Sequence, residues 1–337
     1  MSFVAPPGYQ PIYGPRIPYL GPIYGGLREG VSIYIQGSIP EDITRFYINL
    51  LCGESESSDI ALHFNPRFDG WDKVVFNSCQ EGSWGSEDKI RDMPFSKGQA
   101  FEMVIIATSQ GYQFKVNGND FYTFEHRLPV ERVRAMQIAG DVSIQTINVI
   151  GGGGMGGGMG GGMGGGMGGG MGGGMGGGYP GGGMGGGFPG SNLPGMGGQP
   201  VYNPPVPYSN MIPGGMYPKR TIIIRGMVPY GADRLSINFM VSRSRDIAFH
   251  MNPRVREGMV VRNSMIGGDW GQEDTEASMN PFMEGQYFDM SIRCGNQRFK
   301  VFVNGQHLFD FFHRMQSFNE IDMLEIDGDV QISYIHF

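Results

Sequence analysis

The sequence predicts an all-β protein in which two similar β-sandwich domains are joined by a low-complexity linker. Three observations support this prediction. Apolar and polar residues alternate in short runs, the first half of the chain is repeated in the second, and residues 151–218 form an uncharged Gly/Met/Pro-rich segment between the repeats. The rest of the 337 residues is enough for two domains of ordinary size, each with its own core.

The alternation has a period of two, which is typical of strands with one buried face. Ile33 and Ile35 flank Tyr34, and residues 101–105 and 112–116 follow the same pattern. Gly, Asn, Asp or Pro separates the runs, and no segment shows a capped helical period. Many short strands in a domain of this size indicate an antiparallel sandwich or barrel. We interpret each repeat as a sandwich.

The repeat keeps the same order of motifs in both halves of the chain. Its clearest pairs are LHFNPR with FHMNPR, VVFNS with VVRNS, WGSED with WGQED, PFSKGQAFEM with PFMEGQYFDM, and GDVSI with GDVQI. In both halves a VNG motif precedes an aromatic run that ends in His-Arg. We therefore predict a Pro/Tyr-rich tail at residues 1–18, one domain at 19–150, a linker at 151–218 and a second domain at 219–337. The tail is either extended or packed along the first domain.

Composition excludes several classes of protein. The formal net charge is −7 and neither half has a basic excess, so nucleic acid is not an expected partner. The sequence contains no run of 18 consecutive apolar residues, so membrane insertion is not expected. The amino terminus lacks the pattern of a secretory signal. The three cysteines do not suggest a disulfide framework. The GGGM repeat is expected to be a flexible coil, and 68 such residues would span about 45 Å.

The residues that could bind a ligand begin on one predicted strand. His63, Asn65 and Arg67 lie on one face of that strand, because side chains alternate between its two faces. Further polar residues and a tryptophan complete a set in each repeat: Asn77, Trp84, Glu87 and Lys89 in the first, and His250, Asn252, Arg254, Asn263, Trp270 and Glu273 in the second. Sugars suit such a set, because their hydroxyls both donate and accept hydrogen bonds and the C–H face of the ring packs against an indole.

Each of these residues has an ordinary structural explanation when taken alone. A single histidine is more often a structural surface residue, a single tryptophan is more often part of a core, and an Arg–Glu pair is usually a weak surface ion pair. Their joint occurrence at nearly the same spacing in two repeats favours a ligand site over these explanations.

The motifs HFNPR, VVFN and WGSE, with their second copies HMNPR, VVRN and WGQE, resemble the signature of the galectins. Two copies resemble the tandem-repeat galectins, and the start GYQPIYGPRIPY most resembles one member of that group. The resemblance implies jelly-roll sandwiches that bind β-galactosides without a metal or cofactor. It implies that His63, Asn65 and Arg67 bond the axial O4 of galactose, and that Glu87 braces Arg67, which also reaches the next sugar.

The resemblance also implies roles for the remaining residues. Asn77 and Glu87 would hold O6, and Trp84 would stack on the galactose ring. Lys89 replaces the usual arginine of the family, and the second repeat has Thr275 where a basic residue is expected. This departure puts contacts to the second sugar in doubt, while the other residues of the second repeat match in the same roles.

Three other kinds of protein fit the motif less well. A glycosidase needs two carboxylates at the scissile bond, whereas each repeat offers one, Glu87 or Glu273, and the adjacent Asp88 and Asp274 are expected to face away. A metal-dependent lectin needs clustered oxygen ligands, which the motif lacks. A structural module without a ligand would have lost the polar set. We expect a lectin without enzyme activity that cross-links glycoproteins, glycolipids or cells. The resemblance implies that it is cytoplasmic and is exported to the cell surface without a signal peptide.

Overall fold

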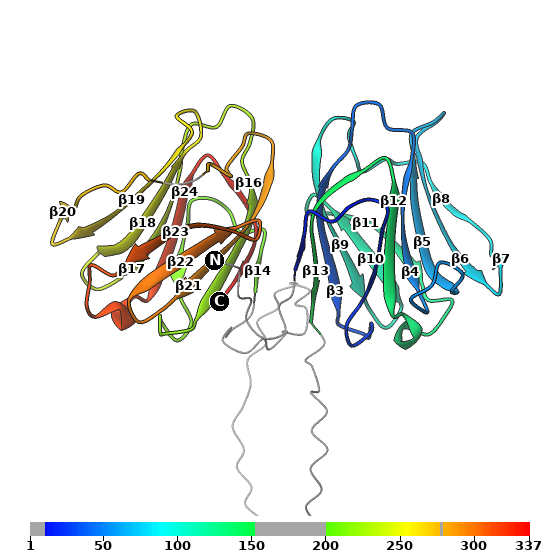
Figure 1. Cartoon of the computed structure of the whole chain (residues 1–337), viewed down its shortest axis with the longest axis horizontal. Helices are drawn as coiled ribbons and strands as arrows, with labels where there is room; N and C mark the ends of the chain where they lie inside the picture. The colour runs from blue at the N-terminus through cyan, green and yellow to red at the C-terminus, as the bar shows by residue number, and fades with distance from the viewer. Residues whose placement is uncertain (1–10, 152–199, 277–278) are drawn as a thin grey trace, which may run out of the picture.

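The computed structural model describes residues 11–151, 200–276 and 279–337. Within these residues the chain is built from β-strands, with two short 3-10 turns, η1 (Val130–Arg132) and η2 (Phe318–Glu320). The strands form four antiparallel sheets that are arranged as two sandwiches (Figure 1). The all-β prediction with two sandwich domains is confirmed. The described residues contain no helix of the length and hydropathy that would cross a membrane.

The first domain has a back sheet of six strands and a front sheet of seven strands. In spatial order, the back sheet consists of β1 (Ile12–Tyr13), β13 (Ser143–Ile150), β3 (Ser32–Ser38), β9 (Ala100–Ala107), β10 (Gly111–Val116) and β11 (Asn119–Glu125). The front sheet consists of β2 (Tyr19–Pro22), β12 (Ala135–Gly140), β4 (Phe46–Leu51), β5 (Ile60–Arg67), β6 (Lys73–Gln80) and β7 (Ser83–Trp84), with β8 (Asp88–Ile90) paired to β6.

The second domain repeats this arrangement with six strands in each sheet. Its back sheet consists of β14 (Val201–Tyr202), β25 (Gln331–His336), β16 (Thr221–Met227), β21 (Tyr287–Cys294), β22 (Arg298–Val303) and β23 (Gln306–Phe312). Its front sheet consists of β15 (Tyr208–Met211), β24 (Met323–Gly328), β17 (Leu235–Val241), β18 (Asp246–Arg254), β19 (Met259–Ile266) and β20 (Asp269–Trp270).

Each domain has its own apolar core between its two sheets. In the first domain Phe64 of β5 stacks on Phe114 of β10, with ring centroids 4.8 Å apart. In the second domain Phe249 of β18 stacks on Phe299 of β22 at 5.2 Å. The period-two alternation produces these cores, because every second residue of a strand points between the sheets.

The VNG motifs form tight hairpins in both back sheets. Asn117 and Gly118 have φ values of 52° and 81°, and Asn304 and Gly305 have values of 51° and 79°. Two consecutive positive φ values are typical of the type I′ turn, whose twist matches that of the flanking strands and which favours Asn-Gly. The motif therefore marks the β10–β11 and β22–β23 turns.

The strand pairing differs from two of the predicted boundaries. The tail predicted at residues 1–18 includes β1, which pairs with β13. The second domain, predicted to begin at residue 219, already includes β14 and β15, which pair with β25 and β24. These uncharged, proline-flanked segments resemble a linker in composition, but they are edge strands, where proline is tolerated. All but the first residue of the GGGM repeat falls within residues 152–199, outside the described residues, so the predicted flexible coil stays a prediction.

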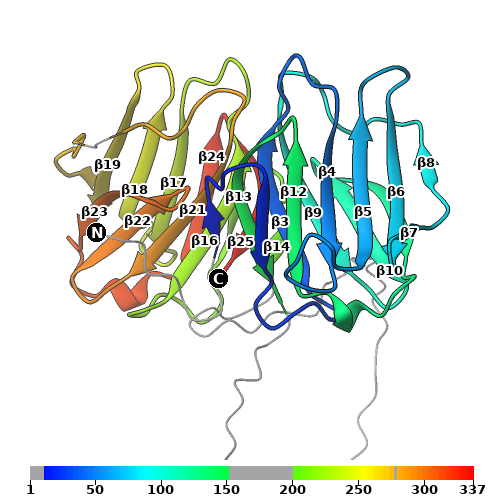
Figure 2. The ribbon, with the colours of Figure 1, turned by 45° about the vertical axis from the view of Figure 1, so that its right-hand side comes forward.

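The two domains lie with their back sheets toward each other. In Figure 1 strands β13 and β3 of the first domain lie beside β14 and β16 of the second, while β7 and β20 lie at opposite ends of the molecule. Figure 2 shows the same arrangement from a second direction. The two front sheets therefore lie on the outside of the molecule.

Candidate functional site

The predicted polar row lies on β5 of the front sheet. Leu62 and Phe64 are buried in the core, while His63 and Arg67 are only partly buried on the outer face. Between them Asn65 donates from Nδ2 to the carbonyl oxygen of Phe46 at 2.7 Å and accepts at Oδ1 from Nε of Arg67, also at 2.7 Å. The row is thus held by its own hydrogen bonds.

The neighbouring strands bring Asn77 and Trp84 beside this row. Asn77 on β6 is the register partner of His63 on β5, and β7 places Trp84 opposite Cys79. The indole of Trp84 is 53% exposed and its ring centroid lies 4.9 Å from that of His63, in an edge-on arrangement. An exposed aromatic face beside fixed polar groups is suited to a molecule with one apolar face and several hydroxyls.

Hydrogen bonding determines which nitrogen of His63 is free. Its Nδ1 lies 2.6 Å from Oδ1 of Asn49, and Nδ2 of Asn49 donates to Oε1 of Gln137 at 3.1 Å. That second bond orients the Asn49 amide, so Nδ1 of His63 carries the hydrogen and Nε2 is left as an acceptor. Burial, with a smaller contribution from the Arg67 charge, lowers the pKa of His63 to about 4. The imidazole is therefore neutral at pH 7.

Arg127 is a supporting residue that the sequence analysis missed. Its Nη1 donates to Oδ1 of Asn77 at 2.9 Å, and Nδ2 of Asn77 donates to the carbonyl oxygen of Gly85 at 3.0 Å. A Cβ at Gly85 would lie 2.9 Å from the same guanidinium nitrogen, so the glycine after Trp84 leaves room for this arginine. The available signal was the His-Arg pair at the end of each aromatic run.

The charged residues differ from the expected arrangement. Arg67 was expected to be braced by Glu87, but Glu87 instead pairs with Lys89, with Nζ and Oε2 3.5 Å apart. Both side chains are largely exposed, so the pair adds little stability. The carboxylate of Asp88 accepts hydrogen bonds from Tyr122 at 2.7 Å and from Arg127 at 3.5 Å. Asp88 therefore helps to anchor the supporting arginine.

The second domain reproduces the polar row on β18. Nδ1 of His250 lies 2.6 Å from Oδ1 of Asn238, and Nδ2 of Asn252 donates to the carbonyl oxygen of Leu235 at 2.8 Å. Nε of Arg254 donates to Oδ1 of Asn252 at 3.2 Å. Burial, and to a smaller extent the charge of Arg254, lowers the pKa of His250 to about 4.

The rest of the second site also matches the first. Asn263 is the register partner of His250, and Arg314 donates to Oδ1 of Asn263 at 2.8 Å. Trp270 is 52% exposed, with its ring centroid 4.8 Å from that of His250. The structure thus brings the predicted residues of each repeat together on the outer face of each front sheet.

The two sites differ at their charged end. In the second domain Nη2 of Arg254 lies 3.8 Å from Oε1 of Glu273, so the expected brace is present there. Arg254 also lies 3.6 Å from Glu257. Thr275 is exposed at the position that corresponds to Lys89. The second site therefore has an arginine–glutamate pair where the first has a lysine–glutamate pair.

The described part of the chain also bears on metal binding and on disulfides. No group of three or more His, Cys, Asp or Glu side chains is arranged to hold a metal ion among the described residues. All three cysteines are free: Cys52, Cys79 and Cys294.

The comparisons with known proteins bear on both domains. The family model described as galactoside-binding lectin matches residues 18–149 and 207–337. Galectin-4 of Sus scrofa is 52% identical over 335 residues, which cover 99% of this chain and 99% of that protein. Galectin-6 of Mus musculus is 45% identical over 336 residues, with full coverage of both chains. Galectin-8 of Rattus norvegicus is 32% identical over 323 residues, with 95% coverage of each.

Proposed function

The chain belongs to the galactoside-binding lectin family and carries the family domain twice, and from this premise we propose that each front sheet binds one β-galactoside, such as lactose or N-acetyllactosamine, without a metal ion. One observation carries the proposal: a half-exposed tryptophan lies edge-on to a neutral histidine in a row of oriented polar groups, and this occurs in both domains. The remaining assignments below depend on that arrangement.

The polar row of the first domain is assigned to the axial O4 hydroxyl of galactose. The free Nε2 of His63 accepts the hydroxyl hydrogen, while Asn65 and Arg67 donate to its oxygen. This division follows from the bonds within the protein, because Nδ1 of His63 is used by Asn49 and a guanidinium can only donate. An equatorial O4 would leave these groups without partners, which disfavours glucose at the same position.

The residues of β6, β7 and the following segment are assigned to the rest of the sugar. Trp84 packs against the C–H face of galactose, and Asn77 and Glu87 hold O6. Lys89 lies beside Glu87 and extends the site toward the next sugar. His250, Asn252, Arg254, Asn263, Trp270 and Glu273 take the corresponding roles in the second domain.

Two sites in one chain allow cross-linking of glycoproteins, glycolipids or cells. Binding of the second site becomes intramolecular once the first is occupied on the same surface, which raises avidity. When the two sites hold glycans on different surfaces, the protein joins those surfaces. The outward position of both front sheets supports this second mode (Figure 1).

Calorimetric titration tests the binding proposal. Full-length protein should bind two lactose molecules per chain in excess chelator, and sucrose, which contains no galactose, should not bind. Hydrolysis of lactose to free galactose, or binding that disappears in chelator and returns with calcium, would contradict the proposal. Aggregation of lactosyl vesicles that lactose reverses would test cross-linking separately.

We also propose that the protein is made in the cytoplasm and acts both there and at the cell surface. The three free cysteines support folding in a reducing compartment, where disulfides are rare. Fractionation of cells, with detection of surface protein that lactose releases, would test both locations.

A further inference from the structure

The outer faces of the two back sheets carry polar residues that are shielded from water. Outward-facing positions on the faces of an isolated sandwich contact solvent. Here Gln36 of β3, Glu102 of β9, Arg225 of β16 and Asp289 of β21 are each 6% exposed or less. They occupy corresponding positions in the two repeats, Gln36 with Arg225 and Glu102 with Asp289. Each back sheet is thus covered by the other, because the domains lie back to back (Figure 2).

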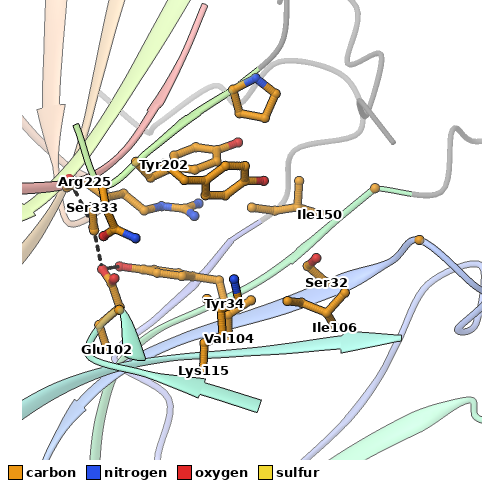
Figure 3. A pocket seen from close by; sticks show the side chains of 16 residues that line it. Ser32, Tyr34, Glu102, Val104, Ile106, Lys115, Ile150, Tyr202, Arg225 and Ser333 are labelled. Carbon is orange, nitrogen blue, oxygen red and sulfur yellow. Dashed lines mark hydrogen bonds between the residues drawn. The ribbon is translucent and has the colours of Figure 1, made fainter. Parts of the chain in front are cut away.

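A network of contacts links the two sheets through Glu102. Its Oε2 accepts a hydrogen bond from Tyr34 of its own domain at 2.6 Å and another from Oγ of Ser333 of the second domain at 2.8 Å. The Arg225 guanidinium lies over the Tyr34 ring, 3.9 Å from its centroid, and over the Tyr334 ring at 4.7 Å. Figure 3 shows Arg225 between Tyr202 and Tyr34 in the pocket that both domains line, with dashed lines for the bonds of Glu102 to Tyr34 and Ser333.

The contact surface extends beyond this network to both hairpin turns. Tyr287 of the second domain donates to Oδ1 of Asn117 in the first at 2.9 Å. Nε2 of Gln36 donates to the carbonyl oxygen of Phe288 at 3.2 Å. A Cβ at Gly305 would clash with the Tyr13 ring, so the β22–β23 turn lies directly against the first domain.

Charge makes this contact selective. A buried carboxylate is costly unless it is hydrogen-bonded and near a cation, and burial raises the pKa of Glu102 despite its two hydrogen bonds. Nε of Arg225 lies 3.4 Å from Oδ1 of Asp289. The Arg225 guanidinium therefore lies near both carboxylates and over two tyrosine rings. A shifted or differently oriented domain would take the Ser333 hydroxyl and the Arg225 charge away from the buried Glu102.

We propose that the two back sheets form a specific interdomain docking surface, centred on Glu102 and Arg225, that holds the lectin domains back to back in solution and directs their two ligand sites in opposite directions. The chain then joins two separate surfaces more readily than it binds one surface through both sites. The docking concerns the fold alone, whereas this consequence for ligands rests on the proposed galactoside binding.

Rotational tumbling of the full-length protein tests the docking. ¹⁵N relaxation should report one correlation time for both domains. Glu102→Lys brings a cation to Arg225 and removes the acceptor for Tyr34 and Ser333. We expect the correlation time to fall about twofold in this variant, because each domain then moves as a body of about half the mass.

Glu125→Lys is the matched control, because it makes the same charge change at an exposed position on β11, at the opposite end of that strand from the Asn117–Gly118 turn. It should keep the correlation time of the unaltered protein. Dispersed amide signals in the ¹H–¹⁵N spectrum would show, independently of lactose, that the Glu102→Lys domains are folded. Independent tumbling of the unaltered domains, or common tumbling in a folded Glu102→Lys variant, would overturn the proposal.

A second measurement tests the consequence for ligands. Vesicles dense in lactosyl lipid should bind equal amounts of the Glu102→Lys variant and the control variant. Only the control variant should aggregate the vesicles, because both sites of a Glu102→Lys chain can reach the same vesicle. Equal aggregation by both variants would overturn the directional consequence. Failure of lactose to bind at all would contradict the proposed function and leave the tumbling result unaffected.

Discussion

Arg127 donates a hydrogen bond from Nη1 to Oδ1 of Asn77 at 2.9 Å, and Arg314 and Asn263 repeat the bond in the second domain at 2.8 Å. The arginine also donates to the neighbouring serine hydroxyl in both domains, at 3.3 and 3.2 Å. This support orients the asparagine amide toward the outer face of the front sheet, so the ligand site depends on a residue that does not itself belong to the polar row.

Arg127→Lys should therefore weaken lactose binding by the first site about tenfold. Lysine keeps the charge but loses the planar fork, and one charged hydrogen bond contributes about 1.5–3 kcal/mol. Calorimetry in a Trp270→Ala background would isolate the first site. Arg132→Lys, at an exposed pair with Asp59, is the control and should leave affinity unchanged. Unchanged affinity in Arg127→Lys would show that Asn77 needs no such support.

Trp84→Ala should reduce the stoichiometry of lactose binding from two to one per chain. The indole supplies the apolar contact that no other residue of the site replaces. Trp71→Ala removes an indole that is 82% exposed and lies against Arg91, 5.5 Å from the ring centroid, and should keep both sites. Two sites of normal affinity in Trp84→Ala would exclude the proposed stacking.

Lactose binding should be constant between pH 7.5 and about pH 5.5 and should fall as the pH approaches 4. Burial lowers the pKa of both His63 and His250 to about 4, and a protonated imidazole cannot accept the O4 hydrogen. The lowered pKa of both histidines also links the free energy of unfolding to pH. Their contribution to stability is fully present above the unfolded pKa of about 6.5 and is lost as the pH falls toward the folded pKa of about 4. Titrations at several pH values, with circular dichroism as a check on folding, would measure the midpoint. A midpoint near 6.5 would contradict this account.

Thr275→Arg should tighten binding of lactose more than binding of galactose. Thr275 is exposed where the first domain carries Lys89, and a guanidinium there can bond the sugar that follows galactose. The comparison requires a Trp84→Ala background, so that only the second site binds. Thr275→Gln, which adds length without charge, serves as the control. An equal gain for both sugars, or no gain, would show that position 275 does not contact the second sugar.

Much of the fold and the polar part of each site could be predicted from the sequence, because both depend on strand alternation. His63, Asn65 and Arg67 share a face whatever the domain around them, and the second copy of the motif makes chance placement improbable. The linker boundaries could not be predicted in the same way. Strands β14 and β15 are short, uncharged and flanked by proline, and only pairing with β25 and β24 distinguishes them from coil.

The sequence by itself determined that this protein has two β-sandwich domains with matching polar sets, because local alternation and repeated motifs are properties of the chain alone. The tertiary structure decided which residues support those sets and how the domains meet. Arg127 reaches Asn77 across 50 positions of the chain, and Glu102 meets Ser333 across 231. Such contacts depend on how strands pair and how domains pack, so residues distant in the sequence become neighbours only when the whole chain has folded.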